Sequence, residues 1–242
     1  MRHVVLERWS RSDSILHRLD ARAKLIVLLV YLVSLATLRD VGSLGIAAFV
    51  IFPLAGLPAS RLPIPALLAR SMLVLPFTLT FAAISFVAGE PERASAMLVK
   101  SYFSALAVLL VVASTPTPAL FHAASSLGAP QALVVVLQFL YRYMFVVAEQ
   151  AARMWSAALC RGAKTSRRSR KQSMVAASGM LAALFAKSYQ RAAAIHKSML
   201  ARGFTGRIPL IELPRWRRAD VAFLGVGSIF LLSARLLPIL WP

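Results

Sequence analysis

Acidic residues are scarce in this chain, and cysteine is almost absent. The 242 residues include 9 Asp and Glu against 28 Lys and Arg, which gives a formal net charge of +19. The single cysteine, Cys160, excludes an internal disulfide framework and a metal site built from several thiolates. The first 24 residues are polar and basic, so we expect no cleavable signal peptide.

The residue patterns of several active sites are also missing. The segment Gly162-Ala163-Lys164-Thr165 ends like a phosphate-binding loop, but the loop needs a glycine directly before the lysine and another five residues earlier. The four histidines share no metal-ligand spacing, and no Ser/His/Asp set or acid pair lies in the apolar segments. We therefore expect a chain that is not an enzyme and holds no cofactor or metal, and whose energy source is another protein.

Apolar residues dominate what is present. They make up 59% of the chain, charged residues make up 15%, and the mean hydropathy is +0.70. A soluble domain has about 45–50% apolar and about 25% charged residues, so the composition predicts an all-α integral membrane protein. Lys and Arg cluster between the apolar runs, as expected for the cytoplasmic face of a membrane protein, and we expect no nucleic-acid partner.

Five apolar runs predict about five transmembrane helices, at 25–38, 41–60, 71–89, 101–114 and 219–240. An odd number of spans puts the two termini on opposite sides of the membrane, and the basic N-terminal arm places the N-terminus in the cytoplasm and the C-terminus outside. Lys24 is expected to extend toward the interface at the start of the first run. Pro76 predicts a kink in the third run, and a Pro-rich loop is expected over 57–65. The predicted divisions are a cytoplasmic arm (1–24), a membrane domain of about four spans (25–115), a basic helical region (116–218) and the last helix (219–242).

Two long helices are predicted within the basic region, from Pro130 to Arg161 and over 173–202. The polar residues of the first, among them Arg142, Glu149 and Arg153, recur at spacings of 4 and 7 and predict a buried or interfacial polar seam. The second is rich in small residues, which predicts a close crossing with the first helix at Ala183 and Ala186.

Each long helix ends in an arginine and then a glycine, as Cys160-Arg161-Gly162 and Ala201-Arg202-Gly203. Glycine just past a helix accepts the left-handed backbone that ends it, and a cation in the last turn faces the free carbonyl groups. Two ordinary C-caps are one interpretation. The repeat lies between residues 153 and 218, which hold 15 Lys and Arg against the single acid Glu212. We therefore predict two arginines side by side that dock a partner's carboxylates or carbonyls.

These residues resemble the transmembrane T component of energy-coupling factor transporters, which are ABC importers. The family's helix ends carry Ala-Arg-Gly; the second copy matches fully, and Cys160 replaces the alanine of the first. The segments Leu140–Phe145 and Asp20–Lys24 are similar to the cobalt/nickel, CbiQ-type branch of the family.

The resemblance implies a coupling subunit, with 116–218 as its coupling-helix region. Its partners would be two cytoplasmic ABC ATPase subunits and a substrate-binding membrane subunit, in the inner membrane of a bacterial cell. Arg161, Gly162, Ala201, Arg202 and Gly203 would dock the ATPases, and the implied substrate is cobalt or nickel. A T component for a vitamin such as biotin, a self-contained secondary transporter and a membrane assembly protein remain alternatives. The sequence shows no inverted repeat or midplane site of the kind a secondary transporter needs.

Overall fold

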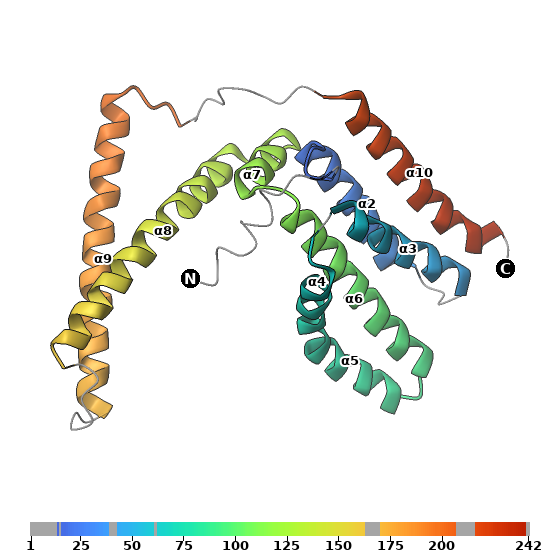
Figure 1. The fold of residues 1–242 in the computed structure, drawn as a ribbon, viewed down its shortest axis with the longest axis horizontal. Helices are drawn as coiled ribbons and strands as arrows, with labels where there is room; N and C mark the ends of the chain where they lie inside the picture. The colour runs from blue at the N-terminus through green and yellow to red at the C-terminus, as the bar shows by residue number, and fades with distance from the viewer. Residues whose placement is uncertain are drawn as a thin grey trace. The chain divides into compact units, whose positions relative to one another are not determined.

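A computed structural model describes residues 14, 16–38, 43–60, 62–162, 170–206 and 216–240, and it leaves out the side chains of 43–48, 170–173 and 235–240. Every regular element within these ranges is a helix (Figure 1). The chain divides into two compact units: 1–127 with 212–242, and 128–211. Predictions for most of the N-terminal arm, the turn at 39–42, the linkers 163–169 and 207–215, and Trp241 lie outside the described residues.

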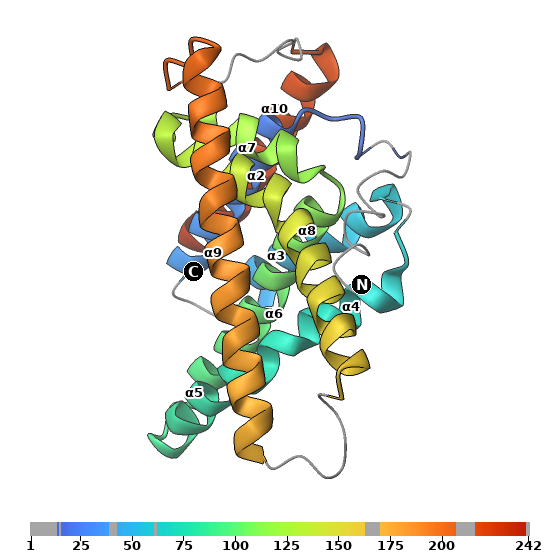
Figure 2. The same ribbon diagram turned by 90° about the vertical axis from the view of Figure 1, so that its left-hand side faces the viewer.

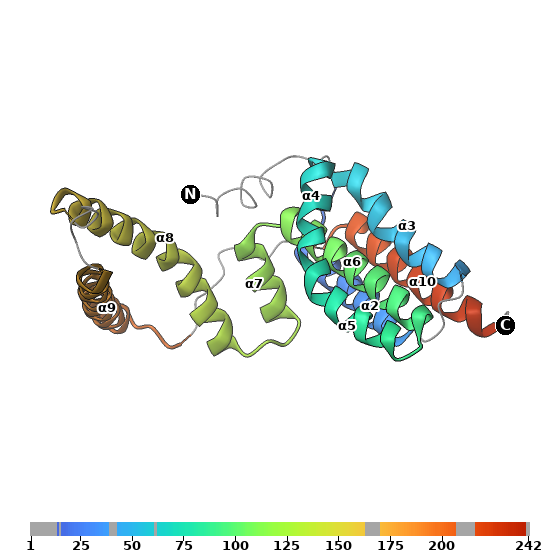
Figure 3. The same cartoon turned by 90° about the horizontal axis from the view of Figure 1, so that it is seen from below.

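The first unit contains α2 (Ala21–Thr37), α3 (Ser43–Ser60), α4 (Ile64–Ser71), the 3₁₀ turn η1 (Met72–Val74), α5 (Leu75–Val87), α6 (Pro91–Ala113), α7 (Thr117–Ser126) and α10 (Arg218–Leu240). Helix α10 packs against α2 and α3, α6 packs against α2, α3, α4 and α5, and α7 packs against α2. Figure 3 shows α2, α3, α6 and α10 running alongside one another. The first and last of the described helices, α2 and α10, are therefore neighbours.

Prolines lie inside one helix and in the first turn of another. Helix α3 contains Pro53 and Pro58 and continues to Ser60, and α4 begins at Ile64, so the loop predicted over 57–65 is shorter than expected at both ends. Such prolines are tolerated in membrane helices when neighbouring groups satisfy the freed carbonyls. Pro76 lies in the first turn of α5, directly after η1 has interrupted the helix. The predicted kink is confirmed, because proline lacks the N–H that a continuous helix needs and clashes with the preceding turn.

The two ends of α2 are held by polar side chains. Asp20 is the N-cap, and its carboxylate accepts a hydrogen bond of 3.0 Å from the backbone N–H of Arg22. At the other end, the ammonium group of Lys100 on α6 donates to the carbonyl oxygen of Leu38. Both contacts satisfy helix-terminal groups that have no partner within the helix.

The prediction that Lys24 extends toward the membrane interface is wrong. Its side chain is only 2% exposed, and Nζ donates to the Ser114 carbonyl oxygen and to Thr115 Oγ1, each over 3.1 Å. These acceptors lie at the junction between α6 and α7, where a helix end leaves carbonyl groups free. The cation is therefore bound inside the first unit, because the fold brings acceptors to it.

The core of this unit joins α2, α3, α6 and α10 in close contact. Tyr31 of α2 is fully buried, and its hydroxyl donates to the carbonyl oxygen of Phe49 in α3. A Cβ atom built on Gly227 of α10 would lie 3.3 Å from Cγ1 of Val27 in α2. Gly227 thus lets α10 approach α2 closely, as small residues do between membrane helices.

Three helical segments of the described chain are long and apolar enough to cross a membrane: Ile64–Val87, Pro91–Ala113 and Gln131–Cys160. Large apolar side chains on α5 and the turn before it, such as Leu73, Phe77 and Val87, are highly exposed, as expected of a surface that faces lipid. The chain is an all-α membrane protein. The count of five spans stays a prediction. Helix α2 has only 17 residues, and the segment Gln131–Cys160 belongs to the two long helices that were not counted among the five predicted spans.

Candidate docking site at the ends of two long helices

The second unit consists of two long helices, α8 (Gln131–Cys160) and α9 (Arg170–Ala201). They run in opposite directions and cross (Figure 1); Figure 2 shows the end of α8 and the start of α9 toward the same end of the unit. Half-buried positions recur along α9 every three or four residues, at 176, 180, 184, 188, 191, 195 and 199. This spacing places them on one helix face, which is the face toward α8.

One side-chain hydrogen bond joins the two helices. Nη2 of Arg191 on α9 donates to Oε1 of Gln150 on α8 over 3.3 Å. No sequence pattern predicts this pair. The only signal was that each residue is a long polar side chain within a mainly apolar helix, and nothing local indicated that the two would meet.

The predicted close crossing at the small residues of α9 is wrong. Ala183 and Ala186 are exposed, and a Cβ atom built on Gly179 would meet no atom within 4 Å. The face toward α8 carries larger side chains, such as Met180 and Leu184. Successive residues are rotated by about 100° around a helix, so the small residues point away from the contact.

The helix ends themselves form as predicted. Gly162 has φ +78° and Gly203 has φ +74°, in the left-handed region that glycine adopts without steric cost. Gly162 N–H donates to the Leu159 carbonyl oxygen over 3.0 Å, and Gly203 N–H donates to that of Leu200 over 2.9 Å. At the second end, Phe204 N–H also reaches the Met199 carbonyl oxygen over 3.0 Å, which completes a Schellman C-cap.

Both arginines stand at these C-caps with exposed side chains. Arg161 and Arg202 are each the residue before the capping glycine, and neither forms an ion pair with another residue of the described ranges. Arg161 follows the end of α8, whereas Arg202 follows the end of α9, whose 32 residues span about 48 Å. The two arginines therefore lie at opposite ends of the unit and not side by side (Figure 1). The antiparallel arrangement is the reason, since it points the C-termini of the two helices in opposite directions.

The polar seam on α8 forms in part. Arg153 Nη1 lies 2.9 Å from Glu149 Oε1, so two seam residues form an ion pair, but their side chains are 65% and 68% exposed. An exposed pair of this kind contributes about 0–1 kcal/mol. Arg142 is exposed too, with its guanidinium carbon 5.7 Å from the centroid of the Tyr143 ring. Within the second unit the seam is not buried, so its burial against a partner stays a prediction.

No group of three or more His, Cys, Asp or Glu side chains with metal-binding geometry is found in the ranges that the structure covers. The features of this unit are capped helix ends and exposed cations, which suit the binding of a partner.

Comparison with known proteins supports the family resemblance. The family model described as CbiQ, cobalt transport protein, matches residues 12–211. The chain belongs to the CbiQ family. A relative in Bacillus selenitireducens, named energy-coupling factor transporter transmembrane protein EcfT, is 28% identical over an alignment 256 positions long that covers 94% of each chain. An uncharacterized protein of Methanocaldococcus jannaschii is 30% identical over 129 residues, 52% of this chain and 46% of its own length. The resemblance inferred from the Arg-Gly helix ends is confirmed, and both ends lie within the matched region of this CbiQ-family chain.

Proposed function

We propose that this chain is the coupling subunit of an ATP-driven importer of the energy-coupling factor type. The observation that carries the proposal is the repeated helix end: two long helices each finish in an exposed arginine, fixed by a glycine in the left-handed conformation. A backbone that is fixed in this way presents the guanidinium group in a defined direction. The planar guanidinium binds carboxylates or carbonyls with two parallel hydrogen bonds, which lysine cannot do.

The separation of the two arginines favours two partners. Arg161 and Arg202 lie at opposite ends of an antiparallel helix pair, so each is placed to dock a different subunit. Two cytoplasmic ATPase subunits that close together would move the two ends of this pair toward one another. The Arg191–Gln150 hydrogen bond joins the two helices and would help to keep them together as their ends move. Long helices transmit such displacements because they move as rigid elements.

The substrate would be held by a separate membrane subunit. We infer cobalt, or nickel, because the family description names cobalt transport. A vitamin such as biotin is the second candidate, since the EcfT relative carries a name without a substrate. The coupling subunit would lie in the inner membrane of a bacterial cell, with its N-terminus and its second unit on the cytoplasmic side.

The docking role is tested by reversing the charge of each arginine. Arg161→Glu and Arg202→Glu should each weaken co-purification of the ATPases from detergent, and the double variant should abolish it, while membrane insertion is retained. Lys187→Glu is the matched control, because this lysine is exposed on α9 and lies well before its end. Full retention of the ATPases by the double variant would exclude the docking role.

Reconstitution into liposomes tests which subunits are needed for uptake. We expect no uptake of Co²⁺, Ni²⁺ or biotin by this chain alone, and uptake only with the ATPases and the substrate-binding subunit. The substrate that is then accumulated distinguishes the metal from the vitamin. Gradient-driven uptake by the chain alone, without ATP, would support a secondary transporter and contradict the proposal.

A further inference from the structure

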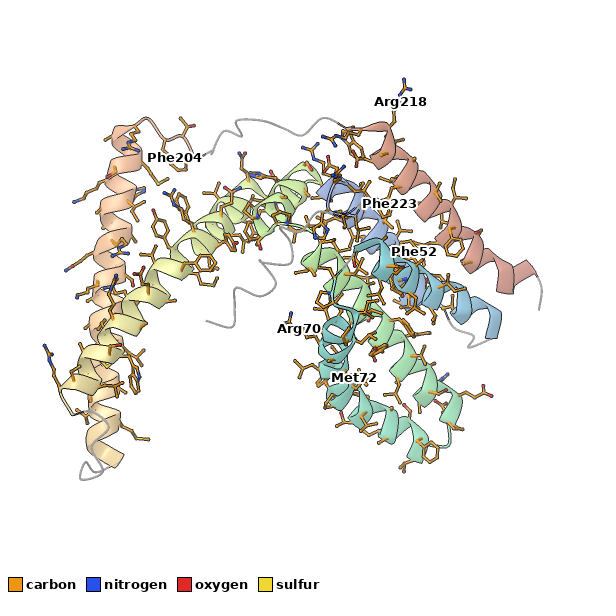
Figure 4. The ribbon with its side chains drawn as sticks, in the orientation of Figure 1. Phe52, Arg70, Met72, Phe204, Arg218 and Phe223 are labelled. Carbon is orange, nitrogen blue, oxygen red and sulfur yellow. The ribbon has the colours of Figure 1, made fainter. Side chains whose placement is uncertain are left out.

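Helices α8 and α9 enclose an open groove on the side of their crossing that leads to the end of α9. Two adjoining hollows of about 580 and about 830 Å³ lie there. They share the lining residues Phe139, Tyr143, Arg191, Ile195, Met199 and Phe204, and we call this surface the α8–α9 groove. Phe204 lies just beyond the end of α9 (Figure 4). Hollows of about 300–1,000 Å³ accommodate a ligand of substantial size.

The groove combines apolar walls with positive charge. Arg142, Arg191 and Arg202 line the larger hollow, and no acidic residue lines either one. Arg142 lies near the Tyr143 ring, and Arg191 donates to the neutral amide of Gln150. None of the three arginines forms an ion pair within the described ranges, and the nearest acid along α8, Glu149, is paired with Arg153. The groove therefore presents uncompensated positive charge beside an apolar surface.

We infer that the α8–α9 groove binds an anionic phospholipid. The phosphate would be held by Arg142 and Arg191, and an acyl chain would lie against Phe139, Ile195 and Met199. Arginine binds phosphate oxygens with two parallel hydrogen bonds, and basic pockets between helices at the cytoplasmic side of a membrane take anionic lipid headgroups.

Charge decides between a lipid and an apolar protein helix as the occupant. An apolar helix in the groove would remove the arginines from water without a counter-ion, which is costly. An anionic lipid covers the same apolar wall and supplies the missing negative charge. The inference rests on the proposed function in one respect, which is that the second unit lies at the membrane surface, where such lipids are available.

A lipid titration tests the inference without any ATPase. The full chain, freed of lipid in detergent, is titrated with dioleoylphosphatidylglycerol or dioleoylphosphatidylcholine, and bound lipid is counted by native mass spectrometry. We expect the anionic lipid to bind more tightly. Arg142→Gln and Arg191→Gln should each weaken its binding by about five-fold, the effect of one cation near an anionic headgroup, and leave the zwitterionic lipid unaffected. Lys197→Gln is the matched control: this lysine is exposed on the same helix and lies outside the groove lining.

A second variant separates the acyl contact from the charge. Ile195→Ser should weaken both lipids alike, because it alters the apolar wall and leaves the arginines in place. Circular dichroism and gel filtration identify any variant that fails to fold. Arg202 is left intact throughout, so failure of the ATPase docking role and failure of lipid binding give different results.

Two outcomes would overturn the lipid inference. One is an unchanged preference for the anionic lipid in the Arg142→Gln/Arg191→Gln double variant. The other is a double variant that keeps its lipid but no longer co-purifies the substrate-binding subunit, which would assign the groove to a protein partner.

Discussion

The carboxylate of Asp220 accepts a hydrogen bond of 2.8 Å from the backbone N–H of Asp20, although 200 residues separate the two. Its second oxygen accepts from the backbone N–H of Arg217, just before α10, over 2.9 Å. Asp220 is only 2% exposed. An acid in the first turn that reaches back to the preceding N–H is half of a capping box. Here the same carboxylate also holds the start of α2, so the first and last helices of the unit begin at one shared group.

Removing this carboxylate should destabilise the first unit. Asp220→Ala leaves two backbone N–H groups without their acceptor, which costs about 1–3 kcal/mol for each group that stays buried. Asp220→Asn keeps one acceptor oxygen and should lose less. The measurement is the midpoint of thermal unfolding in detergent, and Glu92→Ala, which removes an exposed acid of α6, is the control. Equal midpoints for Asp220→Ala and the unchanged chain would show that the shared carboxylate is not needed.

The close approach of α2 and α10 should depend on Gly227. Gly227→Leu places side-chain atoms against Val27, whose Cγ1 would lie 3.3 Å from the added Cβ, and overpacking of this kind costs about 1–3 kcal/mol. Gly225→Leu is the matched control on the same helix, because its Cβ would meet nothing within 4 Å. We expect a lower unfolding midpoint for the first variant alone. The same loss in both variants would trace the effect to the loss of glycine itself.

His122 should make the stability depend on pH. This residue lies on α7, outside the segments long and apolar enough to span a membrane. Burial lowers the pKa of His122 below its usual value of 6.5, and the positive charge of Arg22 lowers it further. Below pH 6.5 the unfolded chain therefore binds a proton that the folded chain does not, so stability falls as the pH decreases through this window.

His122→Gln removes this contribution. The fall in the unfolding midpoint between pH 7.5 and pH 5.5 should be smaller in the variant than in the unchanged chain. His196→Gln is the control for histidine replacement, since that residue lies on the separate helix α9. An identical fall in the His122→Gln variant would show that other groups cause the acid sensitivity.

Much of this fold can be predicted because helix signals are local. Apolar runs mark the helices, and Gly162 and Gly203 mark ends that the structure places within one or two residues of the expected positions. Each such residue acts on the backbone within one turn of itself. The Arg-Gly ends were identified for the same reason, since the cap needs only five or six consecutive residues.

Contacts between distant segments could not be predicted in this way. Lys24 was expected to extend toward the interface, but its acceptors come from a helix junction 90 residues later. The positions of Arg161 and Arg202 depend on the direction in which α9 returns along α8. That direction follows from tertiary packing, and the sequence pattern of either helix end is the same for both directions.

Cys160 offers a direct test of where the second unit lies. It is the only cysteine of the chain, it is exposed, and it directly precedes Arg161. A membrane-impermeant maleimide should label it in inside-out vesicles and not in right-side-out vesicles, if this end of α8 is cytoplasmic. Bound ATPase should then protect Cys160, because docking at Arg161 would cover the adjacent thiol.

Ser95→Cys in a Cys160→Ser background is the control: Ser95 is exposed near the start of α6, the end predicted to lie outside. It should be labelled from the opposite side and gain no protection. Labelling of Cys160 from the outside would invert the proposed orientation, and labelling from the inside without protection would separate Arg161 from the ATPase.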